Sequence, residues 1–194
     1  SSHDGQWEDG GHDGTVYDLE FNDDGTYFCI LGNERDKVHW YGLSTAWDLN
    51  TGYHYANSPN RLGELEYASI YNTNMGGMHF KDDGTKLFLT GMGSAGASGY
   101  DNVAIQYDLE TAWDITTAVE AYVYDLNADA GVSDTSNGHA VFFKPDGTKM
   151  FTIGWGTDKI YEYESTETIT TVIPATFSDR DSTHWHADVE AELE

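Results

Sequence analysis

Short apolar runs alternate with clusters of glycine and acidic residues, and one such pattern occurs three times along the chain. Residues 21–32, 80–91 and 143–154 each read as a strand, an Asp–Gly turn and a second strand. β-Branched and aromatic side chains flank each turn, and these suit a pleated, half-buried surface. Glycine tolerates the positive φ that a two-residue hairpin turn requires, so each stretch predicts a tight β-hairpin.

The hairpins recur with a regular spacing. The turn residues Asp24, Asp83 and Asp146 lie 59 and 63 residues apart. A period of about 60 residues with four short strands per unit is typical of β-propeller blades. Because one four-stranded unit cannot bury both of its faces, neighbouring units must stack. The sequence therefore predicts an all-β, β-propeller-like array of three four-stranded antiparallel blades.

Composition divides the chain into three segments. They are an acidic, Gly/Asp-rich N-terminal arm (residues 1–14), a three-repeat β-propeller-like domain (15–178) and a C-terminal extension (179–194). The extension is interpreted as losing the β pattern, and from Ala187 onward it suits a short helix or a continuing chain. The sequence begins at Ser1 without an initiator methionine, which predicts a processed product or a fragment.

The fourth strand of two repeats is harder to place than the other three. In the first repeat, residues 53–55 and 65–71 both have strand composition. In the third repeat, which lacks the Ala-Trp-Asp turn of the other two, the fourth strand is predicted at residues 171–177.

Aromatic residues occupy equivalent positions in the repeats. Phe21, Phe80 and Phe143 share one register, while Trp47 and Trp113 share another within the Ala-Trp-Asp turns. Repetition in register favours packing over ligand binding. We therefore interpret these five residues as structural anchors that pack between blades or against the preceding turn.

The charge of the chain excludes some partners. Asp and Glu number 34 against 9 Lys and Arg, a net charge of −25. Nucleic-acid binding needs basic side chains on phosphates, and anionic membranes likewise attract basic segments. No apolar run approaches the roughly 18 to 20 residues of a membrane helix. The acidity suits a saline extracellular setting, where salt screens the repulsion.

Metal and thiol chemistry have few candidates. Cys29 is the single cysteine and lies within an apolar run, which predicts a buried, inert thiol. His184 and His186 are the best zinc candidates, although zinc takes three or four converging ligands. The Asp–Gly spacing of residues 1–14 offers oxygen ligands for Ca²⁺. No other cofactor is expected.

Ligand contacts are predicted at one turn. Trp155, flanked by glycines and followed by Asp158, is the best candidate for stacking on a sugar ring. His79 and His139 are placed at the starts of first strands, where they would line the mouth of a central channel or pack in the core or at the rim.

Paired carboxylates offer a weaker route to catalysis. The pairs Glu162/Glu164 and Asp188/Glu190 imitate the two carboxylates of a glycosidase. With 34 acidic residues such pairs arise by chance, so no catalytic residue is assigned.

Two segments carry a resemblance to a known family. Residues 143–151, Phe-Lys-Pro-Asp-Gly-Thr-Lys-Met-Phe, are followed by Asp-Lys-Ile-Tyr-Glu-Tyr at 158–163, and residues 107–118 carry the Trp turn. Together they resemble the β-propeller-like repeats of marine bacteriophage structural and tail proteins and of some secreted bacterial proteins. The resemblance implies a non-enzymatic structural or attachment protein, virion-associated or extracellular, that acts through protein–protein contacts. A carbohydrate-binding module and a glycoside hydrolase fragment are the alternatives.

The number of repeats raises a question of closure. Closed propellers have four to eight blades, so three units leave an open ring with exposed sheet faces. The chain would then be part of a longer protein, or assemble with copies of itself or other structural proteins, or pack as a compact non-propeller fold. Assembly, or membership of a larger particle, is favoured, with surface glycans as a further expected partner.

Overall fold

The computed structural model describes residues 13–51, 61–67, 73–93, 102–126, 137–154, 159–165 and 185–191. Within these residues the strands form three four-stranded sheets. Sheet 1 contains β1 (Val16–Phe21), β2 (Tyr27–Gly32), β3 (Lys37–Gly42) and β4 (Arg61–Glu66). Sheet 2 contains β5 (Thr73–Phe80), β6 (Lys86–Gly93), β7 (Asn102–Leu109) and β8 (Ala118–Asp125). Sheet 3 contains β9 (Asn137–Phe143), β10 (Lys149–Gly154), β11 (Lys159–Ser165) and β12 (Trp185–Ala191). The 3₁₀-helices η1 (Leu49–Thr51) and η2 (Ile115–Thr117) lie in the Trp turns.

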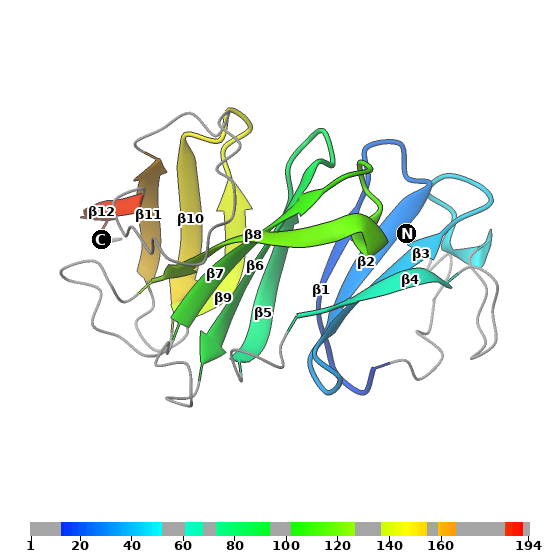
Figure 1. Cartoon of the computed structure of the whole chain (residues 1–194), viewed down its shortest axis with the longest axis horizontal. Helices are drawn as coiled ribbons and strands as arrows, with labels where there is room; N and C mark the ends of the chain where they lie inside the picture. Colours follow the sequence, from blue (N-terminus) through cyan, green and yellow to red (C-terminus); the bar gives the residue numbers. More distant parts are fainter. Residues whose placement is uncertain are drawn as a thin grey trace, which may run out of the picture.

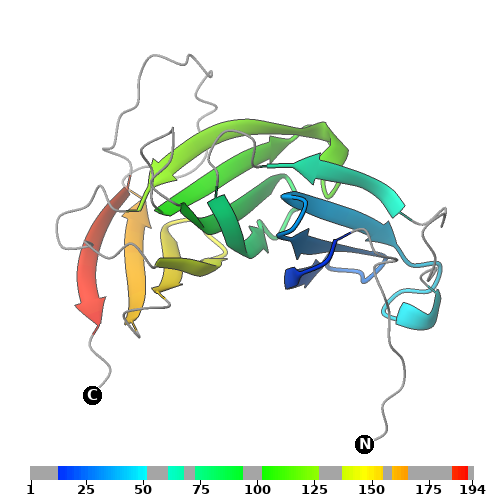
Figure 2. The ribbon, with the colours of Figure 1, turned by 90° about the horizontal axis from the view of Figure 1, so that it is seen from below.

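Each sheet is a simple meander, and the three sheets follow one another along an arc (Figures 1 and 2). All neighbouring strands within a sheet are antiparallel. The first strands lie side by side, because β5 contacts β1 on one side and β9 on the other. The predicted all-β architecture of three four-stranded antiparallel units is confirmed.

The Asp–Gly turns differ from the predicted two-residue hairpin. The first connection spans residues 22–26, because β1 ends at Phe21 and β2 begins at Tyr27. The N–H of Gly25 donates to the carbonyl of Asn22 at 3.0 Å, and the carboxylate of Asp24 accepts from the N–H of Thr26 at 2.9 Å. The aspartate side chain thus forms an Asx turn with the backbone N–H two residues further along the chain. This turn needs more residues than a two-residue loop contains. Positive φ at the turn glycine remains, at 70° for Gly25.

Two tryptophans cover these turns. The N–H of Trp47 donates to the carbonyl of Gly25 at 2.9 Å, and that of Trp113 donates to Gly84 at 2.8 Å. The Trp47 ring stacks on Phe21 at a centroid distance of 5.2 Å, and the Trp113 ring on Phe80 at 4.8 Å. A Cβ atom at Gly84 would lie 2.3 Å from the Trp113 indole. The two tryptophans therefore pack on the turn of their own repeat.

Two apolar clusters join the sheets. Between sheets 1 and 2 the buried residues include Cys29, Leu31, Val38, Met75, Met78, Phe80, Leu87 and Ile115. Between sheets 2 and 3 they include Phe88, Ala104, Tyr124, Val141, Phe143, Met150, Tyr161 and Tyr163. Burial also raises the pKa of the Cys29 thiol well above its ordinary value, as expected for an inert cysteine.

The fourth strands of sheets 1 and 3 differ from expectation. In sheet 1 the strand is Arg61–Glu66, so of the two predicted positions only the start of 65–71 overlaps it, while 53–55 lies outside the described residues. In sheet 3 the fourth strand is Trp185–Ala191, paired antiparallel with β11. The expectation that the C-terminal extension lacks β structure is therefore wrong. Residues 171–177 lie outside the described residues.

In the part of the chain that the structure describes, no helix has the length and apolar character that a membrane crossing requires.

Candidate functional site

A pocket of about 230 Å³ opens between sheets 2 and 3, at the end where both Asp–Gly turns lie. The β5–β6 turn contributes Lys81 and Asp82, and the β9–β10 turn contributes residues 144–147. Phe88 and Phe143 also line the pocket, and their rings stack at a centroid distance of 3.8 Å. The pocket therefore has an aromatic floor and a charged rim.

Three lysines gather on this rim, although the whole chain has only 9 basic residues. Lys81, Lys86 and Lys144 all line the pocket. Lys86 is the most buried of them and binds the carboxylate of Asp108 at 2.6 Å. An ammonium group has three donors, so one carboxylate contact leaves N–H groups for a ligand.

Each turn lysine is held by the aspartate of its own turn. Lys144 pairs with Asp146, and hydrogen bonds from Lys144 and Thr148 lower the pKa of Asp146 to about 2. Lys81 pairs with Asp83. Burial acts to raise the pKa of Asp83, but the bonds from Lys81 and Thr85 outweigh it and lower the pKa to about 2. Both aspartates are therefore ionised near neutral pH and fix the lysines in place.

His79 lines the same pocket from the end of β5. Its Nδ1 lies 3.3 Å from Oε1 of Glu20, and Oε2 of Glu20 accepts the N–H of Phe80 at 2.9 Å. The imidazole also stacks on Phe143, with centroids 6.2 Å apart. A carboxylate that holds one ring nitrogen fixes the tautomer and leaves Nε2 as the basic atom. The predicted position of His79, at the start of a first strand, is wrong.

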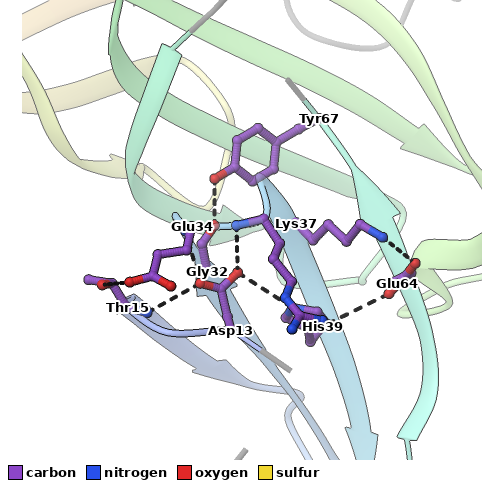
Figure 3. A network of polar contacts seen from close by, with 9 residues as sticks. Asp13, Thr15, Gly32, Glu34, Lys37, His39, Glu64 and Tyr67 are labelled. Atoms are coloured by element: carbon purple, nitrogen blue, oxygen red, sulfur yellow. Dashed lines mark hydrogen bonds and ion pairs between the residues drawn. The ribbon is translucent and has the colours of Figure 1, made fainter. Parts of the chain in front are cut away.

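A second polar cluster lies on sheet 1 (Figure 3). Asp13 is buried, and its carboxylate accepts backbone N–H groups from Glu34 at 2.9 Å, Thr15 at 3.2 Å and Arg35 at 3.3 Å. Burial acts to raise the pKa of Asp13, but these hydrogen bonds and the nearby His39 outweigh it and lower the pKa.

Buried His39 lies between two carboxylates of this cluster. Its Nε2 is 3.7 Å from Asp13, and its Nδ1 is 4.0 Å from Glu64, which also binds Lys37 at 2.6 Å. The Tyr67 hydroxyl donates to the carbonyl of Gly32 at 2.6 Å. A Cβ atom at Gly32 would lie 2.1 Å from the Asp13 carboxylate. The residues of this cluster pack closely against one another, and we interpret the cluster as a structural link between the strands of sheet 1.

Most of the ligand and metal residues predicted from the sequence lie outside what the structure describes. Trp155, Asp158 and His184 are outside the described residues, and so are residues 1–12, which were considered for Ca²⁺. His186 lies in β12, whose side chains are not described. Among the described residues no group of three or more potential metal ligands is found.

The predicted carboxylate pair Glu162/Glu164 has a partner in the structure. Both side chains bind Lys149, Glu164 at 2.9 Å, and together they raise the pKa of that lysine. Glu162 and Glu164 point to the same face of β11, where Lys149 pairs with both. This arrangement is an ion-pair network on the sheet surface rather than an acid and base facing a substrate.

The sequence analysis did not identify the lysine rim. Lys81 and Lys144 stand at equivalent positions, two residues before the turn aspartate, where the first repeat has Asn22. That repetition of a rare basic residue in an acidic chain was the available signal.

Comparisons with known proteins support the fold alone. No protein-family model matches the chain, and no curated protein matches it. Among solved structures, the chain is similar to a protein assigned as a 6-phosphogluconolactonase from Bacteroides fragilis, with a TM-score of 0.52 and 12% identity over 77% of this chain and 35% of that one. It is also similar to the periplasmic gluconolactonase of Pseudomonas aeruginosa, with a TM-score of 0.51 and 12% identity over the same shares of the two chains.

A third neighbour is not named as an enzyme. The β-propeller domain of Cps50 (Swd1) from Myceliophteria thermophila has a TM-score of 0.50 and 9% identity over 78% of this chain and 38% of that one. The chain thus spans little more than a third of the length of these neighbours. All three likenesses define the class: this chain has β-propeller-type architecture.

These neighbours correct the function predicted from the resemblance. Two of the structures reported above are named as lactonases, which are enzymes, and this contradicts a non-enzymatic structural or attachment protein. The resemblance to phage and secreted proteins is supported only as far as the propeller architecture. The predicted virion or cell-surface location is untested and stays a prediction.

Proposed function

We propose that the pocket between sheets 2 and 3 binds a small organic anion, a carboxylate or a phosphate ester. The observation that supports this is the convergence of Lys81, Lys86 and Lys144 above the Phe88–Phe143 floor, in a chain with a net charge of −25. Ammonium groups bind carboxylate and phosphate oxygens, and the aromatic rings contribute apolar contact to the carbon skeleton.

The pocket is also built for selectivity. Asp82 and Asp146 line it beside the lysines, so a ligand with hydroxyl donors next to its charge would satisfy both signs of charge. A volume of about 230 Å³ suits one small molecule.

Titration with 6-phosphogluconate and with gluconate, followed by calorimetry, tests the proposal. We expect saturable binding that weakens with added salt. Lys86→Gln should raise the Kd roughly tenfold, because a hydrogen bond to a charged group is worth about 1.5–3 kcal/mol. Lys37→Gln is the matched control, since Lys37 lies on β3 and is not among the residues that line the pocket. Equal affinities of the two variants, or no saturable binding, would contradict the proposal.

A second function is favoured by the Glu20–His79 pair. With Nδ1 held by Glu20, Nε2 of His79 can accept a proton from a water that attacks the carbonyl carbon of a bound ester or lactone. A rim lysine stabilises the oxyanion, the carbonyl carbon–oxygen single bond breaks, and the imidazolium returns the proton to the leaving alkoxide. Such a step suits the enzymes among the structural neighbours.

Hydrolysis of δ-gluconolactone, followed by base consumption at constant pH, tests this step. We expect a rate above the spontaneous one, reduced roughly 100-fold in His79→Gln because general base catalysis contributes about 10²–10⁴-fold. His139→Gln, a histidine of β9 that is not among the pocket-lining residues, is the control. A rate equal to the spontaneous rate would contradict the hydrolysis proposal. The anion-binding proposal is tested independently, by the calorimetric titration.

A further inference from the structure

The pocket between sheets 2 and 3 has one charged lining residue that no other side chain binds. Each lysine of the rim binds one aspartate, in the pairs Lys81–Asp83, Lys86–Asp108 and Lys144–Asp146. His79, the remaining basic side chain of the lining, lies against Glu20. Asp82 lines the pocket beside Lys81 and is exposed, and its carboxylate has no ion pair or hydrogen bond among the described residues.

The charges around the pocket therefore do not balance. Three lysines face four aspartates, once the two aspartates that bind Lys81 and Lys86 from outside the lining are counted. Each lysine keeps at least one N–H for the oxygen atoms of a ligand, because an ammonium group has three donors. A carboxylate only accepts hydrogen bonds, so Asp82 requires a donor from the ligand. The site thus offers donors for an anionic group and, next to them, one unpaired negative charge.

The two turns that form the pocket differ at this position. Asp82 directly follows Lys81, and the equivalent residue after Lys144 is Pro145, which also lines the pocket. Proline carries no charge and no backbone N–H. The turn of sheet 3 therefore brings only its Lys144–Asp146 pair to the pocket, and the unpaired carboxylate lies on the side of the β5–β6 turn alone.

The charge of the whole chain favours the same kind of ligand. A net charge of −25 produces a negative potential that repels anions and attracts cations. A ligand with a positive and a negative group carries less net negative charge than a simple anion of the same size, so the chain repels it less. The overall field and the local carboxylate therefore both favour a ligand with a positive group.

We propose that the ligand of this pocket is an organic anion that also carries an ammonium group, as an amino-sugar phosphate does. The inference rests on the proposed anion-binding function and adds the substrate class. The rim lysines bind the phosphate or carboxylate oxygens, and Asp82 accepts an N–H from the ammonium group of the ligand. A hydrogen bond between two charged groups is stronger than one to a hydroxyl, so Asp82 distinguishes an amino group from a hydroxyl at the same position.

Two sugar phosphates that differ in one substituent test the proposal. Glucosamine 6-phosphate has an ammonium group at C2, where glucose 6-phosphate has a hydroxyl. In calorimetric titrations of the full chain, we expect glucosamine 6-phosphate to bind roughly tenfold more tightly. N-Acetylglucosamine 6-phosphate keeps the nitrogen without its charge and should bind no more tightly than glucose 6-phosphate.

A variant of the unpaired carboxylate assigns this preference to its source. Asp82→Asn should weaken binding of glucosamine 6-phosphate roughly tenfold, while the affinity for glucose 6-phosphate stays the same or rises because a negative charge is lost. Retained binding of glucose 6-phosphate shows that the variant folds. Asp23→Asn is the matched control, since Asp23 holds the equivalent exposed position in the first repeat and does not line the pocket. It should leave both affinities unchanged.

The outcomes separate this inference from the proposed function. Equal affinities of the wild-type chain for the amino and the hydroxyl sugar phosphate would overturn the inference and leave anion binding intact. A preference that persists in Asp82→Asn would do the same. If neither sugar phosphate binds, and 6-phosphogluconate does not bind either, the anion-binding proposal is wrong and this inference is overturned with it.

Discussion

Replacing Phe143 with alanine should lower the free energy of unfolding by about 3–5 kcal/mol, the range found for buried Phe→Ala changes. Phe143 is buried in the cluster between sheets 2 and 3, and its ring stacks on Phe88 at 3.8 Å. Alanine would leave a cavity at this junction, and the rigid sheets on either side cannot close it. Urea unfolding followed by tryptophan fluorescence measures the change.

The neighbouring residue provides a matched control. Phe142 has the same chemistry and lies on the opposite face of β9, where it is 54% exposed. In dilute protein at low salt, Phe142→Ala should change the free energy of unfolding by less than about 1 kcal/mol. Similar losses for the two variants would mean that sheets 2 and 3 do not pack as described.

Replacing Asp13 with asparagine should destabilise the chain by about 2–3 kcal/mol, through buried N–H groups that lose an acceptor. The carboxylate of Asp13 accepts three backbone N–H groups, from Thr15, Glu34 and Arg35. An asparagine side chain keeps one acceptor oxygen and turns an NH₂ group toward the remaining donors. Asp23→Asn, at an exposed turn position, is the control and should be close to neutral.

The Asp13 contribution should also depend on pH. Its folded-state pKa lies below the ordinary value of 3.8, so the folded state favours the ionised carboxylate. The stabilisation is therefore complete above the unfolded-state pKa and is lost as the pH falls through the folded-state pKa. Measured by urea unfolding, the difference between wild type and Asp13→Asn should stay constant from pH 7 to about 5 and shrink below about 4. A difference that grows in acid would contradict this assignment.

Several features of the fold followed from local patterns. The three Asp–Gly–Thr turns were recognisable because glycine supplies positive φ and the aspartate binds the backbone two residues on. The turn length was misjudged, since that aspartate contact needs a longer loop than the dipeptide alone suggests. Strand β12 was missed although Trp185, Ala187, Val189 and Ala191 alternate with polar residues, because the segment is short, acidic and terminal.

The pocket was beyond the reach of sequence patterns. Its walls come from residues 79–88 and 143–147, about 60 residues apart in the chain. No sequence pattern within either segment predicts that Phe88 stacks on Phe143, or that Glu20 of the first repeat contacts His79 of the second. These contacts exist only because the sheets stack with their first strands side by side.

The sequence by itself determined the units: three hairpin repeats, their period, the aromatic anchors and the acidic surface. The alternation of apolar and polar residues and the chemistry of turns depend on residues that are close in the chain, so both can be recognised from the sequence. The tertiary structure alone decided which face of each sheet meets the next and which charges gather at a junction. Those outcomes depend on contacts between repeats. Because the repeats share one pattern, their sheets have equivalent faces, and the pattern does not show which face contacts a neighbouring sheet.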